Sequence, residues 1–412
     1  MRHYITFFVL VLFFACCSCE ILDDNPEDYP DTPAPVSLGE VAELFSALPL
    51  EKSHITEVFD AVSSSSVNGY DEEYTLSNLF AAPGSGVGDD SSDSTRAGEN
   101  TYPVPLRELI CQHLENQAAE RSAMETKSSS EIWMSPEEYV KFLSSSDIQI
   151  YWPYYERWDG EELPVITYDP CDGSSANEGY RLSRGDDGSV EVEKVIVDEE
   201  MAMASPVWVI NRNDDSGYTS LEMLRKQNPG GGIIVSPAAS ERFSSKLKGT
   251  SGGAGQALIL KDFTMKRNYD SWFAGASEFF VKTGAVEDFC AATEAEMWLY
   301  SPTITDFMIV VKRNQVGIPQ PFNAVLVSEW TEALTHSAFL ITEDDGGTKV
   351  SWDCTAMVKV NSKSYGFELK IPLNRRDDIV WRGQLSRKFI WGNVGQVCHF
   401  GDVDITFDVL DY

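Results

Sequence analysis

The pattern of apolar and polar positions is helical in the first third of the chain. Ser37 is followed three residues later by Glu40, and apolar residues then recur at helical spacing, which is the capping-box signature of a helix start. Ser135 and Glu138 repeat this signature, with Pro136 at the first helical position. Two further helices are expected over residues 71–82 and 105–126.

After Ser146 the pattern becomes extended. Short apolar or alternating runs are separated by Gly and Asp, and residues 186–188 (Asp-Asp-Gly) have the composition of a hairpin turn between two such runs. Between Val403 and Val409 apolar residues alternate with Asp and Thr, as in a strand of a sheet with one buried and one solvent-exposed face. Strands are expected at 148–150, 165–168, 190–197, 207–210, 233–235, 257–260, 278–281, 307–311, 324–327, 338–341, 350–352, 356–360, 367–371, 389–391 and 403–409.

These elements predict an α+β protein with an N-terminal helical region, a β-rich middle segment and a C-terminal antiparallel β-sandwich. Immunoglobulin-like, C2-like and jelly-roll topologies are all compatible with the strand pattern. The expected segments are a lipoprotein signal peptide (1–15), an acidic, Pro-rich tether (16–36), a mainly helical region (37–145), a β-rich segment (146–240), a Gly/Ser linker (241–255) and the sandwich (256–412).

The N-terminus has the layout of an export signal. Arg2 and His3 precede an apolar run over residues 5–15, which at roughly 11 residues is shorter than the ~20 that span a bilayer. The residues from Phe13 to Cys16 resemble the bacterial lipobox, in which a small residue precedes the cysteine that becomes lipidated. We therefore expect lipidation at Cys16, with Cys19 as the alternative and an ordinary secretory signal as the competing interpretation.

Two segments resemble lipoproteins of Bacteroidota. The acidic residues Glu20, Asp23, Asp24, Glu27 and Asp28 look like the tag that directs such lipoproteins to the cell surface. Residues 268–281 are similar to segments of uncharacterised lipoproteins from these bacteria. The resemblance implies a lipid-anchored protein of the outer membrane, exposed at the cell surface, and it implies no activity.

Composition narrows the classes of partner. The formal net charge of −33 repels nucleic acids and anionic headgroups, so the expected contact with the membrane is the N-terminal lipid alone. Beyond the leader the cysteines are scattered singly and form no C-x-x-C motif, which indicates neither a zinc site nor a disulfide scaffold. Most of them are expected as buried free thiols, with a Cys354–Cys398 bridge as the alternative.

The segment 211–222 spaces oxygen-bearing side chains like an EF-hand loop, which makes Ca²⁺ a candidate cofactor. Its candidate ligands are Asn211, Asn213, Asp215 and Glu222. Asn stands where the first Asp is expected, and Gly217 falls one position late for the sharp turn. A polar turn leading into a short helix is the favoured interpretation.

Aromatic residues are concentrated in the segment 151–159. Trp152, Tyr154, Tyr155 and Trp158 are candidate ligand-binding residues, because flat rings beside carboxylates suit sugar recognition. Rings packed in a core are the commoner arrangement, and we favour that interpretation.

No catalytic motif has the right context. Residues 249–253 match G-x-S-x-G, but an extended run instead of a helix follows them, so a flexible linker is the better interpretation. Histidines are few, and no H-E-x-x-H pair exists. The leading hypothesis is a non-enzymatic surface lipoprotein that binds a glycan or an envelope protein. The alternatives are a lipid-anchored hydrolase acting on glycans through carboxylates or a cation, and a structural envelope protein.

Overall fold

The chain is an α+β protein, seen here in a computed structural model that describes residues 36–81, 105–124, 134–185, 189–213, 217–227, 232–236 and 255–411. Its first sheet is mixed: β3 and β6 are parallel, and all other neighbours are antiparallel. Its spatial order is β1 (Glu73–Thr75), β2 (Ile148–Tyr151), β6 (Val207–Arg212), β3 (Val165–Tyr168), β4 (Ala176–Arg184) and β5 (Val190–Asp198).

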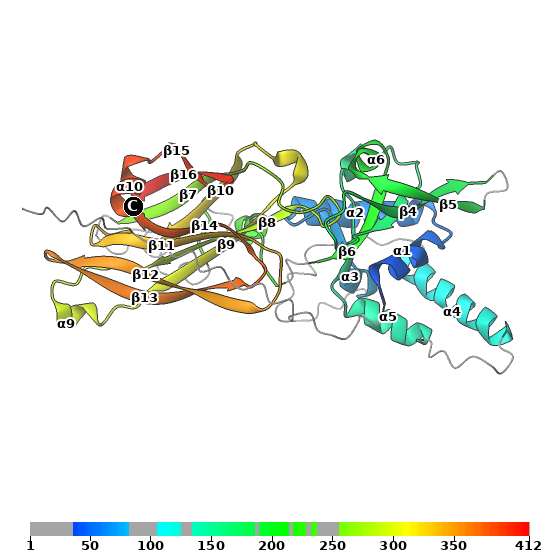
Figure 1. Cartoon of the computed structure of the whole chain (residues 1–412), viewed down its shortest axis with the longest axis horizontal. Coiled ribbons are helices and arrows are strands. Elements are labelled where there is room, and N and C mark those ends of the chain that lie inside the picture. Colours follow the sequence, from blue (N-terminus) through cyan, green and yellow to red (C-terminus); the bar gives the residue numbers. More distant parts are fainter. Residues whose placement is uncertain are drawn as a thin grey trace, which may run out of the picture. The chain divides into compact units, whose positions relative to one another are not determined.

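Helices flank this sheet and share its hydrophobic core (Figure 1). Both predicted capping boxes are confirmed: the hydroxyls of Ser37 and Ser135 accept the amide protons of Glu40 and Glu138, whose carboxylates accept the serine amides in return. The helices with residues in this core are α1 (Leu38–Ser46), α2 (Lys52–Val67), α3 (Leu76–Phe80), α4 (Leu106–Met124) and α5 (Pro136–Ser144), with a 3₁₀ turn η2 (Tyr155–Arg157). Helix α6 (Glu199–Ala204) belongs to a separate cluster with β3, β5 and β6, and α7 (Leu221–Gln227) buries two leucines in the core of the sandwich.

One core therefore draws on both the expected helical region and the expected β-rich segment. Val41 and Phe45 of α1 are fully buried in it together with Ile166 of β3 and Trp208 of β6. Burying each such side chain contributes about 1.5–3 kcal/mol, which fixes the helices to the sheet.

The C-terminal part is an antiparallel β-sandwich (Figure 1). Its four-stranded sheet has the order β10 (Gln320–Val327), β7 (Gln256–Met265), β16 (Val403–Asp411) and β15 (Val397–Phe400). The second sheet has the order β13 (Lys363–Asn374), β12 (Lys349–Val360), β11 (Leu334–Glu343), β8 (Ser277–Ala285) and β9 (Thr303–Val311), with β14 (Asp378–Ser386) also paired to β11. Shorter elements are α9 (Glu294–Met297), η3 (Arg313–Gln315) and α10 (Arg387–Gly392).

Aromatic rings join the two sheets of the sandwich. Phe263 of β7 lies 5.1 Å from Phe279 of β8, and Phe407 of β16 lies 6.1 Å from Phe339 of β11, measured between ring centroids. All four rings are at most 1% exposed. The alternating pattern predicted for Val403–Val409 accordingly places its first three apolar residues in this core.

Three predicted elements are wrong. Residues 71–82 were expected to be one helix, but they form strand β1 followed by the short helix α3. Residues 389–391 were expected to be a strand, but they belong to α10, which Ser386 caps. Residues 233–235 form only an isolated bridge at Ile234. The last two are short apolar runs, for which periodicity alone does not separate helix from strand.

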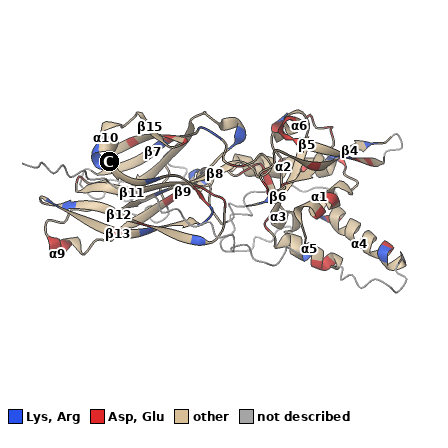
Figure 2. Cartoon of the chain, in the orientation of Figure 1, with Lys and Arg blue, Asp and Glu red and all other residues tan. Residues whose placement is uncertain are grey.

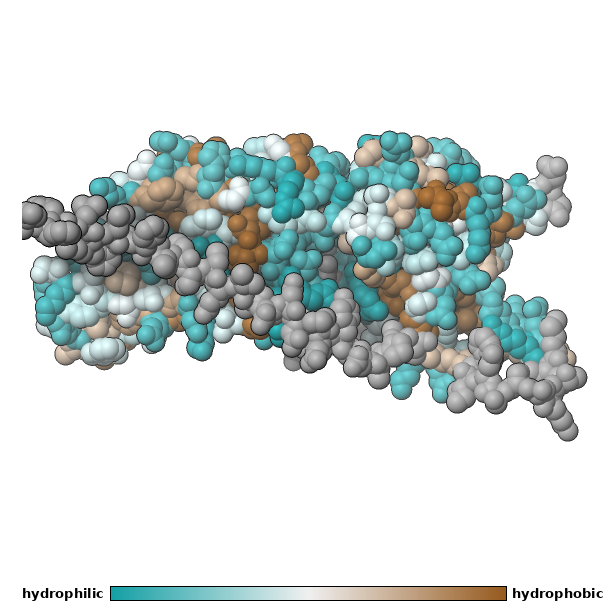
Figure 3. Space-filling model, viewed as in Figure 1, coloured by the Kyte–Doolittle hydropathy of each residue, from teal (hydrophilic) through white to brown (hydrophobic). Residues whose placement is uncertain are grey.

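Charge is spread over the surface, as Figure 2 shows for the acidic residues of α5, α6 and α9. Figure 3 shows a mainly hydrophilic face with several apolar patches, one of them in the region of α10 and β15. Phe389, Trp391 and Val397 are exposed apolar residues of that region. Among the residues that the structure describes, no helix has the length and apolar character needed to cross a membrane.

Candidate functional site

The predicted lipidation site lies outside the described residues, as do Cys19 and the G-x-S-x-G segment at 249–253. The five cysteines that the structure describes are all free thiols, so Cys354 and Cys398 form no bridge. Of these five thiols only Cys398 is buried, and Cys171 and Cys290 are exposed, so the expectation that most would be buried is wrong.

The candidate cation ligands of segment 211–222 have other partners. Asn211 donates its amide to the carbonyl oxygens of Phe273 and Ala274, at 3.1 and 2.5 Å. Asn213 donates to the side chains of Glu73 and Gln149, at 2.7 and 2.9 Å. Glu222, at the start of α7, pairs with Arg225, and Asp215 lies outside the described residues. The two amides thus hold neighbouring segments together. Strand β6 ends at Arg212 and so includes the first two residues of the segment 211–222, which an EF-hand would use as a loop.

The aromatic segment at 151–159 lies largely in the core. Trp152 is 1% exposed and its ring contacts those of Trp158 and Trp208, at 5.5 and 6.0 Å. Tyr155 is 6% exposed. Tyr154 donates its hydroxyl to Glu199 at 2.8 Å, and burial raises its pKa to about 12. These positions favour the core-packing interpretation over ligand binding.

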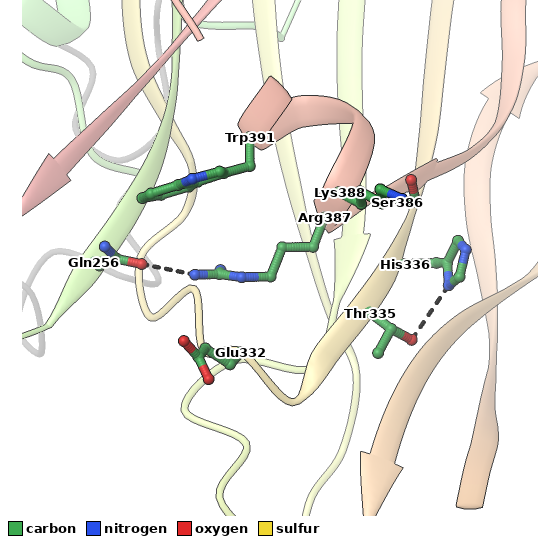
Figure 4. A pocket seen from close by; sticks show the side chains of 8 residues that line it. All are labelled: Gln256, Glu332, Thr335, His336, Ser386, Arg387, Lys388 and Trp391. Atoms are coloured by element: carbon green, nitrogen blue, oxygen red, sulfur yellow. Dashed lines mark hydrogen bonds between the residues drawn. The ribbon is translucent and has the colours of Figure 1, made fainter. Parts of the chain in front are cut away.

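A cavity of about 700 Å³ lies on the sandwich where α10 meets strand ends from both sheets (Figure 4). This volume is within the roughly 300–1,000 Å³ of small-molecule sites. Three segments that are distant in sequence line the cavity: the start of β7, the start of β11 with the loop before it, and the end of β14 with α10. The lining residues are Gln256, Glu332, Thr335, His336, Ser386, Arg387, Lys388 and Trp391.

Arg387 organises this cavity. Its guanidinium donates to the Trp330 carbonyl oxygen at 2.9 Å and to Oε1 of Gln256 at 2.7 Å. It also lies 3.9 Å from the ring centroid of Trp330 and 5.6 Å from that of Trp391. Burial lowers the pKa of Arg387, and the nearby Glu332 carboxylate opposes this effect. Since every contact positions a ring or a strand end, Arg387 is a positioning residue of the cavity wall.

Trp391 presents the apolar surface of the cavity. Its side chain is 52% exposed, whereas Trp330, 6.0 Å away between ring centroids, is 2% exposed. Figure 4 shows the Trp391 ring on one side of Arg387 and Glu332 on the other. Buried Trp330 and the guanidinium thus support one indole ring that remains open to solvent.

Polar groups of several kinds surround this ring. The ammonium of Lys388 and the carboxylate of Glu332 are exposed, and His336 lies beside the hydroxyl of Thr335, with 3.2 Å between Nδ1 and Oγ1. The hydroxyl of Ser386 accepts the amide of Phe389 at 3.1 Å and keeps its own proton for donation. The cavity therefore offers a flat apolar face together with donors and acceptors, the combination that binds a ligand with both a C–H face and hydroxyl groups.

Sequence reasoning missed this cavity. Phe389 to Trp391 was interpreted as a strand, and its partners at 256 and 332–336 are distant in sequence. Only the antiparallel pairing of β14 with β11, which sets His336 opposite Ser386, brings these segments together. No local signal in the sequence marked the cavity, because Arg387 and Lys388 form one of five adjacent cation pairs in the chain.

Comparisons of the chain with protein-family models, with curated proteins and with solved structures found no significant match.

Proposed function

We propose that this protein is a cell-envelope lipoprotein whose β-sandwich binds a glycan in the cavity beside α10. The proposal has two parts, location and ligand. Location rests on the leader that ends at Cys16, with Cys19 as the alternative lipid acceptor, and on the acidic residues that follow. The anchor would be acyl chains in the outer membrane, and the body would face the outside of the cell.

The observation that supports a glycan is the solvent-open ring of Trp391 inside a cavity rimmed by polar groups. A sugar stacks its C–H face on such a ring, and its hydroxyls pair with carboxylate, ammonium and hydroxyl groups such as those of Glu332, Lys388 and Thr335. The mixed charge of the rim suits a neutral or amino sugar better than a polyanion. This assignment moves the binding site from the aromatic segment at 151–159 to the sandwich.

A glycan array probed with the purified full chain tests the proposal. Trp391→Ala is the informative variant, and Phe389→Ala is its matched control, because Phe389 is an exposed ring of the same helix that does not line the cavity. Calorimetry on the glycans that bind should show at least tenfold weaker binding by Trp391→Ala and unchanged binding by Phe389→Ala. Equal binding by wild type and Trp391→Ala, or no glycan bound at all, contradicts the assignment.

Two further outcomes would replace the proposal. Hydrolysis of a bound glycan would identify a lipid-anchored hydrolase. If the protein neither binds nor hydrolyses any glycan, and cells lacking it have an envelope defect, it would be identified as a structural envelope protein.

A further inference from the structure

Three carboxylates converge at the end of the sandwich away from α10. Asp270 lies in the loop between β7 and β8, Glu343 is the last residue of β11, and Asp345 follows in the turn after it. One oxygen of each lies within 4.8 Å of those of the other two. Because side chains alternate along an extended chain, residues 343 and 345 face the same side, toward Asp270.

The spacing fits one cation. Ca²⁺ binds carboxylate oxygens at about 2.3–2.6 Å, so two oxygens on one ion lie at most about 4.6–5.2 Å apart. All three separations fall within that limit. Three carboxylates from two segments also form the hard, anionic oxygen set that Ca²⁺ prefers.

A second, independent observation points to a ligand at this cluster. The carboxyl group of Asp270 interacts with the side chains of Ser277 and Glu343, but its Oδ2 atom is buried and has no hydrogen-bond partner. Buried polar atoms in folded proteins almost always have a partner, so a carboxylate oxygen without one in a cluster of three carboxylates indicates a group that binds it. Burial raises the pKa of Asp270, and burial together with the charges of Asp270 and Asp378 raises the pKa of Asp345 to about 7.

More negative charge lies next to the cluster. Asp344 is 1% exposed and points to the opposite side, where Asn374 and the amide of Gly346 donate to its Oδ1 atom. Asp377 lies beside Asp344, and burial together with the interaction with Asp344 raises the pKa of Asp377 to about 7.

Two arginine charges act on the cluster. The guanidinium of Arg313 donates to the backbone oxygen of Asp270 at 3.1 Å and forms an ion pair with Glu199 at 2.8 Å. Arg376 lies near enough to Asp345 to lower its pKa, but burial outweighs this effect.

We propose that Asp270, Glu343 and Asp345 form a divalent-cation site, with Ca²⁺ as the ion that fits. The cation would tie the turn after β11 to the loop before β8. This loop carries Trp272 and Phe273 into a hydrophobic cluster with strands β3 and β6 of the first sheet. Cation binding would therefore strengthen the attachment of that loop to the first sheet, a role independent of the glycan cavity.

Calorimetric titration of the EDTA-treated full chain with CaCl₂ tests the site, and MgCl₂ provides the comparison. Asp345→Asn is the main variant, because it removes a ligand charge from a partly exposed turn while keeping the side-chain shape. Asp353→Asn, an exposed carboxylate on β12, is the control for the loss of one charge. Wild type and Asp353→Asn should bind one Ca²⁺ and melt at a higher temperature with it, since a ligand that binds only the folded state stabilises it.

Asp345→Asn should bind Ca²⁺ at least tenfold more weakly and lose the melting shift. If that variant does not fold, Asp270→Asn, checked by circular dichroism, takes its place with the same expectation. Absence of heat and of any melting shift at 5 mM Ca²⁺ in the wild type overturns the proposal, as does unchanged Ca²⁺ affinity in a folded ligand variant.

Discussion

Replacing Arg387 by alanine tests the construction of the cavity wall. The change removes the hydrogen bonds to the Trp330 carbonyl and to Gln256, and it removes the cation that packs against two indole rings. The Trp330 carbonyl loses a charged donor, which costs about 1–2 kcal/mol. The half-buried Gln256 can pair with water instead, so its loss costs about 0.5 kcal/mol. The ring contacts add about 0.5–1.5 kcal/mol.

Together these losses predict a free energy of unfolding about 2–4 kcal/mol lower in Arg387→Ala. Arg387→Lys should recover about half of the loss, because it keeps the charge but cannot make both hydrogen bonds of the planar guanidinium. Lys388→Ala, the exposed neighbour, should stay within about 0.5 kcal/mol of wild type. Urea unfolding followed by tryptophan fluorescence measures these differences. An Arg387→Ala midpoint equal to that of Lys388→Ala would refute the role given to the guanidinium.

Further predictions concern the first sheet and its helices. Gly179→Ala should destabilise the protein by about 1–3 kcal/mol in thermal melts, because its Cβ would lie 2.8 Å from the backbone oxygen of Ile166. Gly392→Ala is the control and should be near neutral, because the space around Gly392 is open. Burial raises the pKa of Glu57 above its ordinary 4.5, so the folded state binds its proton more tightly than the unfolded state. The stability of wild type relative to Glu57→Gln should therefore be greatest below pH 4.5 and decline as pH rises through the folded-state pKa; a relative stability that increases with pH would contradict this sign.

Local signals in the sequence predicted much of the fold. The capping boxes at Ser37 and Ser135 each lie within four residues, so they can be predicted without knowledge of the tertiary structure. The alternation over Val403–Val409 predicted a strand with one buried face for the same reason. Residues 186–188 lie outside the described residues, but the strands on either side, β4 and β5, pair antiparallel as expected for a hairpin.

Long-range contacts explain what the sequence did not predict. Leu76 and Leu79 have helical spacing and lie in α3, but Tyr74 before them pairs with Ile150 of β2, and this pairing makes the start of the segment a strand. The sequence from Glu343 to Asp345 holds only part of the carboxylate cluster, because its partner Asp270 is distant in the chain. Both candidate sites are assembled by sheet pairing, and no short motif encodes either of them.

Metabolic labelling with a fatty acid tests most directly whether a lipid anchor holds the protein in the membrane outside the cytoplasm. Cells expressing the full chain, and a variant with Cys16 and Cys19 both replaced by serine, are fed the labelled acid and fractionated. We predict that the wild type carries the label in the outer-membrane fraction, and that the double variant carries none and leaves that fraction. An unlabelled wild type, or a double variant that remains in the membrane as before, would contradict the location on which surface glycan binding depends.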